Sequence, residues 1–423
     1  MTPTVSTLRY RRRIQVANAA AWVAERLGSP LGRLDVDSIV ASARRATGLT
    51  DAGDPRFLEP MSWIVRACAE SPEVTALARI VLRQTWIRAV ENRLLLQAWV
   101  ARRPAVLEQP VHRPIFVIGF PRTGTTLVQN LLALDPTRRG LTFWELLVPV
   151  PVDDDVERDR RKRRGIARRT LDAAYQIAPE MTAVHAIDAE SYEECWPLFG
   201  NTFCVMNWDL QSGLRAYGDR LLAPGWDMQP TYREVRCYYQ VLLDRGPPDG
   251  RSGATQLVLK CPEHLWFLDA LLDVFPDACV VWMHRDPCET LASYCSLISM
   301  QWRTLYGVID PPRIGAHVED RLLSGVERAM AARVGRDPRR FFDVRFPDLV
   351  RDPAAVVREL ARWFDLPLAA DHPAKVAAYL ATERTDGRGR HTYDGSMYGL
   401  DPDRIRERYG AYASAFLPPG KAA

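Results

Sequence analysis

The apolar run Ile115-Phe-Val-Ile118, followed directly by the glycine-rich stretch Gly119-Phe-Pro-Arg-Thr-Gly-Thr-Thr126, constrains the fold of this chain more than any other feature. A short continuous apolar run is typical of a parallel strand that is buried on both faces. Helical periodicity over 126–134 follows the glycines. A strand, a tight turn and a helix in this order predict the start of a βαβ unit.

Three later segments repeat the change from a strand pattern to a helix pattern. These are Gln256–Lys260 before 263–275, 278–283 before 288–300, and Phe341–Arg345 before 354–364. Such alternation predicts a parallel sheet with helices on both faces. The predicted fold class is therefore α/β, with a P-loop-like three-layer parallel sheet and a helical N-terminal extension.

The 423 residues exceed one ordinary domain, because domains average roughly 150 residues. Residues 1–110 show helical patterns over 35–46, 57–68 and 74–100, and they hold no candidate catalytic cluster. We predict a helical extension or cap at 1–110 and an α/β core at 111–423. The core would carry a variable acceptor-binding insertion at about 150–255 and end in an amphipathic helix over 401–412.

Composition and charge exclude several classes of protein. The formal net charge of +4 is too small to indicate a nucleic-acid partner. No stretch of 18 uninterrupted apolar residues occurs, so we expect no membrane-spanning segment. Gln15 and Asn18 interrupt the apolar stretch near the start, so we expect an amphipathic helix there and a cytoplasmic protein. The eight cysteines form no C-x-x-C pair and have no zinc spacing, which predicts reduced thiols and no metal. The oligomeric state stays open.

The glycine-rich stretch has the form G-x-x-x-x-G-T-T. Backbone N–H groups in such a turn, together with the start of a helix, suit a phosphate-like anion. The stretch departs from the Walker A loop because Thr125 stands where that loop has a lysine, and Arg122 lies inside it. A nucleotide with a 5′ anion shorter than a triphosphate is favoured. The predicted binding residues are Arg122, Thr123, Gly124, Thr125 and Thr126.

A second candidate anion site follows the predicted strand 278–283. His284 and Arg285 precede Asp286 there, where a Walker B strand would present a magnesium-binding aspartate. Arg285 at the carboxyl end of a strand, with the hydroxyl of Ser293 from the next helix, forms the pattern of an anion site. Open α/β sheets bind ligands at that edge. The alternative for Arg285 is a surface ion pair with Asp286.

These motifs resemble those of sulfotransferases. The segment 120–126 looks like their 5′-phosphosulfate loop, and 284–287 with Ser293 resembles their 3′-phosphate site. The segments 259–264 and 275–278 are similar to the large bacterial branch of the superfamily, to which tyrosylprotein sulfotransferases are distantly related. The resemblance covers about 110–410, more weakly over 150–250. Its donor would be 3′-phosphoadenosine 5′-phosphosulfate (PAPS).

The resemblance implies in-line transfer of a sulfuryl group to a hydroxyl of a small-molecule, lipid or glycan acceptor. Arg122 would hold the 5′ end of the donor, and Lys260 would neutralise charge on the transferred group. Sulfuryl transfer resembles phosphoryl transfer, in which such charge stabilisation dominates. The segment 385–391 resembles a loop that closes over the nucleotide. Its residues Arg388, Gly389 and Arg390 would reach the 3′-phosphate.

An acceptor hydroxyl needs a general base. Glu145 is the first candidate, since it matches in position the catalytic glutamate of the tyrosylprotein branch. His264 is the second candidate, although it follows Lys260 by four residues and cytosolic sulfotransferases have a spacing of two. His185 is the third. It lies near an acidic group that would orient a base, bind a polar acceptor or form a solvated helix face: Asp188, Glu190, Glu193 and Glu194.

Two other functions stay open. A P-loop nucleotide kinase-like enzyme would need a Walker lysine and a magnesium-binding aspartate, and neither occurs at its expected place. A catalytically silent nucleotide-binding protein on the same fold is compatible with the sequence. The aromatic-rich stretch 196–226 either lines an apolar acceptor pocket or belongs to the core, and the arginine-rich run 158–169 predicts a solvated helix face.

Overall fold

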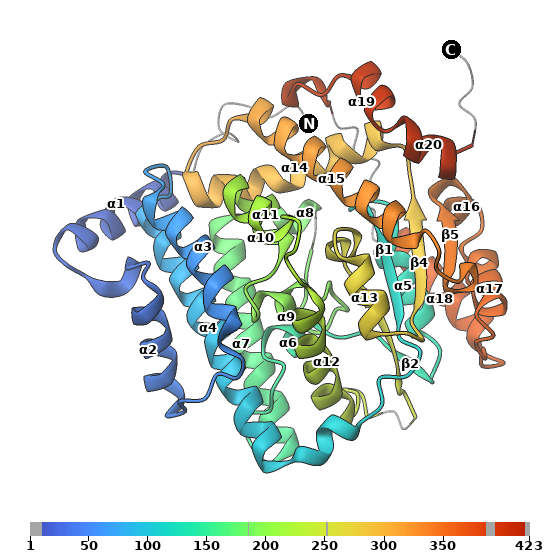
Figure 1. Ribbon diagram of the computed structural model, residues 1–423, viewed down its shortest axis with the longest axis horizontal. Helices are drawn as coiled ribbons and strands as arrows, with labels where there is room; N and C mark the ends of the chain where they lie inside the picture. The colour runs from blue at the N-terminus through green and yellow to red at the C-terminus, as the bar shows by residue number, and fades with distance from the viewer. Residues whose placement is uncertain (1–10, 185, 251–252, 386–393, 419–423) are drawn as a thin grey trace.

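A computed structural model describes residues 11–184, 186–250, 253–385 and 394–418. Five parallel strands form one sheet in the order β2-β3-β1-β4-β5, with β1 at its centre (Figure 1). The strands are β1 Ile115–Gly119, β2 Arg138–Arg139, β3 Gln256–Lys260, β4 Cys279–His284 and β5 Phe341–Arg345. The predicted parallel sheet is confirmed, and all five residues of β1 are buried, as expected for a strand covered on both faces.

Helices cover both faces of the sheet. Ile115 and Val117 point to one face, where they share a core with helices α5 (Thr125–Ala133), α16 (Phe346–Arg351), α17 (Pro353–Trp363) and α18 (His372–Thr385). Phe116 and Ile118 point to the other face, toward α12 (Gln229–Asp244), α13 (Leu268–Val274), α14 (Pro287–Tyr306) and α15 (Pro311–Arg333). Figure 1 shows α16–α18 and α13 on opposite sides of the strands. The three-layer arrangement is therefore confirmed.

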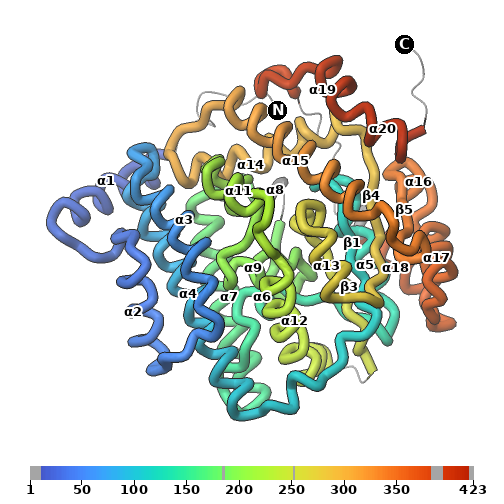
Figure 2. The backbone as a smooth tube through the Cα atoms, in the orientation of Figure 1, coloured from blue at the N-terminus to red at the C-terminus, as the bar shows by residue number. Residues whose placement is uncertain are grey.

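The N-terminal region is helical, as predicted. It contains α1 (Arg12–Arg26), α2 (Val36–Thr47), α3 (Leu58–Glu70) and α4 (Ala76–Arg102). The Asp35 side chain accepts a hydrogen bond from the Ser38 N–H (2.8 Å) at the start of α2, and Gly48 ends that helix with φ +71°. Ile39 and Trp86 belong to the same core as Phe116 of the central strand. The N-terminal helices, blue in Figure 2, therefore share one apolar core with the sheet.

The segment at about 150–255 is mostly helical. It contains α7 (Val156–Ile177), α8 (Met181–Val184), α9 (Trp196–Gly200), α10 (Met206–Ser212), α11 (Arg215–Leu221) and α12. Most arginines of α7 face solvent, but Arg163 is 2% exposed and donates to the Val148 carbonyl (2.7 Å). From the aromatic stretch, Phe199 and Phe203 are fully buried in the main core.

Three details differ from the sequence-based expectation. The expected helix over 263–275 is interrupted at Phe267 (φ −132°, ψ 34°), which separates a 3₁₀ turn, η5 (Pro262–Leu265), from α13. The expected final helix is two short helices, α19 (Pro402–Arg408) and α20 (Gly410–Phe416), because Tyr409 between them leaves the helical conformation (φ −92°, ψ 12°). The edge strand β2 consists of two arginines, which carry no apolar strand signal.

The remaining described elements are short. They are α6 (Phe143–Leu147) and the 3₁₀ turns η2 (Pro30–Gly32), η3 (Pro55–Phe57), η4 (Pro104–Glu108), η6 (Pro338–Arg340) and η7 (Ser396–Tyr398). Within the described ranges, every helix is too short or too polar to cross a bilayer.

Candidate functional site

The glycine-rich loop connects the carboxyl end of β1 to the first turn of α5. Gly119 has φ +134°, and a Cβ there would lie 2.5 Å from the Met283 carbonyl oxygen of β4. Gly124 has φ +86°, and a Cβ there would lie 2.6 Å from Leu349 Cδ2. Both positions therefore require glycine. The loop leads directly into the α5 start, where the first N–H groups of a helix have no intrahelical acceptor and attract anions.

Arg122 links the loop to the second predicted anion site. Its own backbone has φ +69°. Its Nε donates to the Ser293 hydroxyl on α14 (3.2 Å), and its carbonyl oxygen accepts from Arg285 Nη1 (2.7 Å). Arg122, Arg285 and Ser293, which come from two separate sequence motifs, thus lie together at the carboxyl edge of the sheet.

Arg285 follows the last residue of β4. Its Nε and Nη2 donate to Glu289 Oε2 (3.0 and 2.6 Å), and its guanidinium lies 4.1 Å from the Phe346 ring centre. The ion pair of Arg285 is thus with Glu289 and not with Asp286, whose carboxylate accepts from the Cys288 N–H (2.8 Å) and caps α14. Arg285 remains 22% exposed, so its charge is accessible from solvent.

Lys260 ends β3, beside the central strand, where it pairs in register with Val117. Its side chain is 1% exposed, and its Nζ donates to Thr126 Oγ1 on α5 (3.2 Å) and to Glu194 Oε1 (3.4 Å). Burial lowers the pKa of Lys260, but the nearby carboxylates of Glu194 and Glu193 outweigh that effect, so its pKa is raised. Lys260 is therefore a buried cation at the start of α5.

Glu145 is the third residue of α6, and its side chain completes the capping box with Thr142. Its Oε2 accepts from the Thr142 N–H (3.0 Å) and from the Thr142 hydroxyl (2.9 Å), while Oε1 forms an ion pair with Arg139 of β2. The side chain is 2% exposed. Both of its oxygens are thus engaged by neighbouring protein groups.

His264 is completely buried, one residue after Glu263 in η5. Its Nδ1 lies 3.0 Å from the Tyr232 hydroxyl, and its Nε2 lies 3.3 Å from Cys195 Sγ. Both ring nitrogens therefore have protein partners. His185, Arg388, Gly389 and Arg390 lie outside the described residues.

Glu194 was singled out only as a member of an acidic group in the sequence, and the structure places it beside Lys260. Its side chain is 23% exposed. The N–H of the next residue, Cys195, donates to the Lys260 carbonyl oxygen (3.1 Å). Because 66 residues separate Glu194 from Lys260 in the chain, no local pattern signals this contact.

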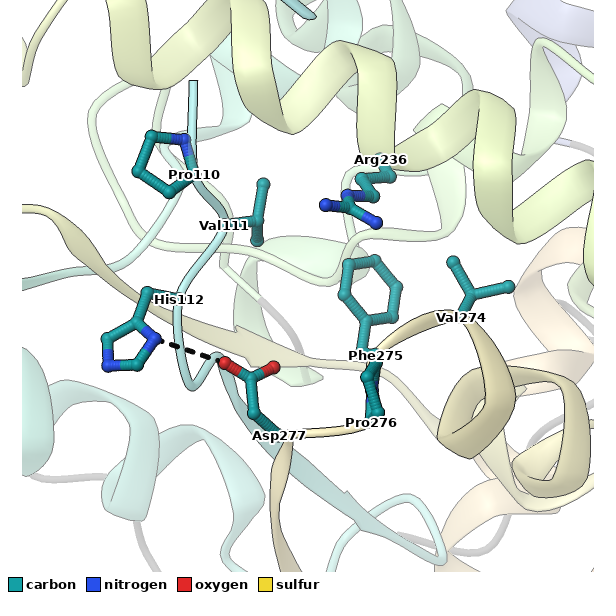
Figure 3. A pocket seen from close by; sticks show the side chains of 8 residues that line it. All are labelled: Pro110, Val111, His112, Arg236, Val274, Phe275, Pro276 and Asp277. Carbon is teal, nitrogen blue, oxygen red and sulfur yellow. Dashed lines mark ion pairs between the residues drawn. The ribbon is translucent and has the colours of Figure 1, made fainter. Parts of the chain in front are cut away.

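Among the described residues, two of the cavities lie away from this site. One, of about 270 Å³, is lined by the eight residues drawn in Figure 3, where His112 Nδ1 and Asp277 Oδ2 lie 3.2 Å apart. Apart from Arg236 on α12, its lining residues directly precede β1 and β4, so it lies at the amino edge of the sheet, opposite the loop. The other, of about 490 Å³, lies between the N-terminal helices and α12, with Phe57, Trp226 and the Arg93–Glu234 ion pair in its wall.

The site is built from cationic, hydroxyl and backbone groups. Across the described parts of the chain, no three His, Cys, Asp or Glu side chains gather in the manner of a metal site. The arrangement suits a ligand with two separated anionic groups, one at the α5 start near Lys260 and one near Arg285 and Ser293.

Comparison with known proteins agrees with this chemistry. Residues 114–370 match the model of the sulfotransferase family. The chain is 26% identical over 282 residues to the omega-hydroxy-beta-dihydromenaquinone-9 sulfotransferase Stf3 of Mycobacterium bovis and of Mycobacterium tuberculosis. Each alignment covers 63% of this chain and 66% of the relative, which is just under two thirds of the relative's length.

Two solved structures are similar over most of the chain. Sulfotransferase STF9 from Mycobacterium avium has a TM-score of 0.79 at 28% identity, with 92% of this chain and 98% of that chain covered. Sulfotransferase STF1 from Mycobacterium tuberculosis H37Rv has a TM-score of 0.74 at 30% identity, with coverage of 89% and 98%. The similarity thus extends into the N-terminal helical region.

Proposed function

The chain belongs to the sulfotransferase family. We propose that it moves the sulfuryl group of PAPS to a hydroxyl group of a small-molecule, lipid or glycan acceptor. The family uses PAPS as donor. The observation that carries the proposal is the buried Lys260 ammonium, which contacts Thr126 at the start of α5, next to a loop without the Walker lysine. The Stf3 relatives are sulfotransferases of omega-hydroxy-beta-dihydromenaquinone-9, a hydroxylated lipid, which supports including lipids in the acceptor class.

In this proposal the loop N–H groups and Arg122 bind the 5′-phosphosulfate. Arg285 and Ser293 bind the 3′-phosphate, and the Arg122–Ser293 and Arg285–Arg122 hydrogen bonds couple the two sites. Lys260 stabilises the negative charge that develops on the bridging oxygen as the sulfur–oxygen bond breaks. Arg388, Gly389 and Arg390 are proposed to add contacts to the 3′-phosphate.

A kinase-like reaction would require a different set of groups. It needs a lysine in the loop and an aspartate that is free to hold magnesium at the end of β4. Thr125 occupies the first position, and the Asp286 carboxylate caps α14. These two residues favour PAPS over ATP.

Calorimetric titration with 3′,5′-adenosine bisphosphate (PAP, the desulfated donor) tests the donor. We expect PAP to bind at least 100-fold more tightly than ATP with magnesium, a difference of about 2.7 kcal/mol by the affinity relation. Tighter binding of ATP would contradict the sulfotransferase proposal. Mass spectrometry of acceptor mixtures incubated with PAPS, which detects the added sulfuryl group, would then identify the acceptor class.

Replacing Arg285 with alanine should weaken PAP binding by about 2–3 kcal/mol, because a charge-assisted contact to phosphate is lost. Calorimetry measures this change directly. Arg336→Ala is a matched control, since Arg336 pairs with Asp273 near the amino ends of the strands (2.8 Å). Equal PAP affinity of the Arg285 variant and the wild type would remove Arg285 from the nucleotide site.

A further inference from the structure

We propose that Glu194 is the general base that takes the proton from the acceptor hydroxyl; this inference rests on the sulfotransferase function proposed above. The sequence favours Glu145 for that role. Three observations favour Glu194 instead: its fixed backbone position beside the end of β3, its contact with Lys260, and its exposure to solvent.

The backbone on both sides of Glu194 is held by neighbouring elements. The N–H of Glu193 donates to the Leu141 carbonyl oxygen (3.0 Å), just before α6. The N–H of Cys195 donates to the carbonyl oxygen of Lys260 itself (3.1 Å). Because hydrogen bonds flank it on either side, the Glu194 side chain projects from a fixed backbone position at the carboxyl end of the sheet, where open α/β sheets bind their ligands.

Glu194 also lies close to the point where transfer would occur. Lys260 Nζ is 3.2 Å from Thr126 Oγ1 and 3.4 Å from Glu194 Oε1. Thr126 lies in the first turn of α5, where the 5′ end of the donor is proposed to bind. The Lys260 ammonium therefore contacts both Thr126, where the sulfuryl group is proposed to lie, and the Glu194 carboxylate. An acceptor oxygen that attacks the sulfur would then lie close to Glu194.

Two of the other candidate bases, Glu145 and His264, are occupied, and the third, His185, lies outside the described residues. Both oxygens of Glu145 are bound, by Thr142 and by Arg139, and its side chain is 2% exposed. Both ring nitrogens of His264 have partners, and the ring is completely buried. A general base must reach the acceptor proton within hydrogen-bond distance. Glu194, 23% exposed, is accessible to an incoming hydroxyl in a way that these two side chains are not.

The acceptor oxygen attacks the sulfur of PAPS and forms a new O–S bond. The bond from sulfur to the bridging oxygen breaks, and its electron pair leaves on the phosphate of PAP, where the Lys260 ammonium stabilises it. The acceptor proton moves to the Glu194 carboxylate and is later released to water. The products are the sulfate ester, PAP and one proton.

The test uses Glu194→Gln, which keeps the shape of the side chain and removes its basicity. Glu157→Gln is the control: Glu157 is 73% exposed in the first turn of α7 and pairs with Arg160 (3.3 Å). Each variant is incubated with PAPS and either 4-nitrophenol or unsubstituted phenol, and water alone is the blank. At mildly alkaline pH 4-nitrophenol is largely ionised, whereas phenol is not. Release of PAP measures turnover, and calorimetry with PAP measures donor binding.

We expect Glu194→Gln to lower turnover with phenol by roughly 10²–10⁴-fold, typical of a lost general base. Turnover with ionised 4-nitrophenol should fall far less, because that acceptor has no proton to lose. PAP affinity should stay within a few-fold of the wild type, and Glu157→Gln should keep turnover with both acceptors.

Three results would overturn the inference. Full turnover of Glu194→Gln with phenol would remove Glu194 from catalysis. An equal loss with both phenols would mean that Glu194 acts through the charge of Lys260. A loss with phenol in Glu145→Gln, while Glu194→Gln retains turnover, would assign the base to Glu145. Failure of the proposed function looks different: the wild type itself would bind no PAP and release none from PAPS.

Discussion

Lys260→Met is expected to lower kcat at saturating PAPS by roughly 10²–10³-fold, the cost typical of removing one preorganised group that stabilises transition-state charge. Methionine has nearly the same length as lysine but lacks the charge. In the protein the lysine is 1% exposed and carries a raised pKa under the influence of Glu194 and Glu193, so the variant removes a permanent cation from a water-poor site.

The loss should be larger in kcat than in PAP affinity, because charge on the bridging oxygen grows as the sulfur–oxygen bond breaks. Steady-state kinetics and calorimetry on the same preparation give the two values. Lys375→Met is the control, since Lys375 on α18 is 40% exposed and pairs with Asp371, just before that helix. Equal fold losses in kcat and in PAP affinity would contradict the proposed role and leave Lys260 as a residue that only binds the nucleotide.

The parallel sheet could be predicted because its signals are local. Each of the strands β1, β3, β4 and β5 carries its own apolar run, and a helical pattern follows each of them within a few residues. The edge strand β2 carries no such run, since it consists of Arg138 and Arg139, so it was not predicted. Tertiary pairing with Gln256 and Leu257 places this pair in the sheet.

The sequence placed Arg122 and the pair Arg285 and Ser293 in two separate anion sites, and parallel strands bring both sites to one edge of the sheet. The direct contacts between them were not predicted. The function of each remains a proposal. The surroundings of Glu145 could not be predicted from the sequence. Its Thr142 capping partner is local, but whether the carboxylate faces solvent or a buried arginine depends on where β2 lies.

The surroundings of Glu194 could not be predicted from the sequence either. Its contact with Lys260 depends on the path of an irregular segment between α8 and α9, which is fixed by backbone hydrogen bonds to Leu141 and to Lys260. Backbone hydrogen bonds of this kind leave no side-chain pattern in the sequence. The acidic group was visible, and only the folded chain shows which of its members approaches the loop.

Arg139→Met should destabilise the protein by about 3–5 kcal/mol, the typical cost of leaving one charge of a buried ion pair without its partner. Arg139 and Glu145 are 1% and 2% exposed, and Glu145 Oε1 pairs with Arg139. Urea unfolding followed by circular dichroism, with the slope held common, measures the change as a lower midpoint. Arg351→Met is the control for an exposed pair, and its effect should lie within about 1 kcal/mol of zero because Arg351 is 76% exposed.

The double variant Arg139→Met with Glu145→Gln separates charge from packing. Glutamine has no charge to leave unpaired, and its side-chain oxygen can still accept from the Thr142 N–H, so most of the lost stability should return. A double variant as unstable as Arg139→Met alone would mean that the arginine acts through its own packing and its contact with the Leu242 carbonyl (3.3 Å). Recovery would show that the Glu145 charge is held by Arg139, the arrangement expected of a carboxylate that stabilises the start of α6 while Glu194 accepts the proton.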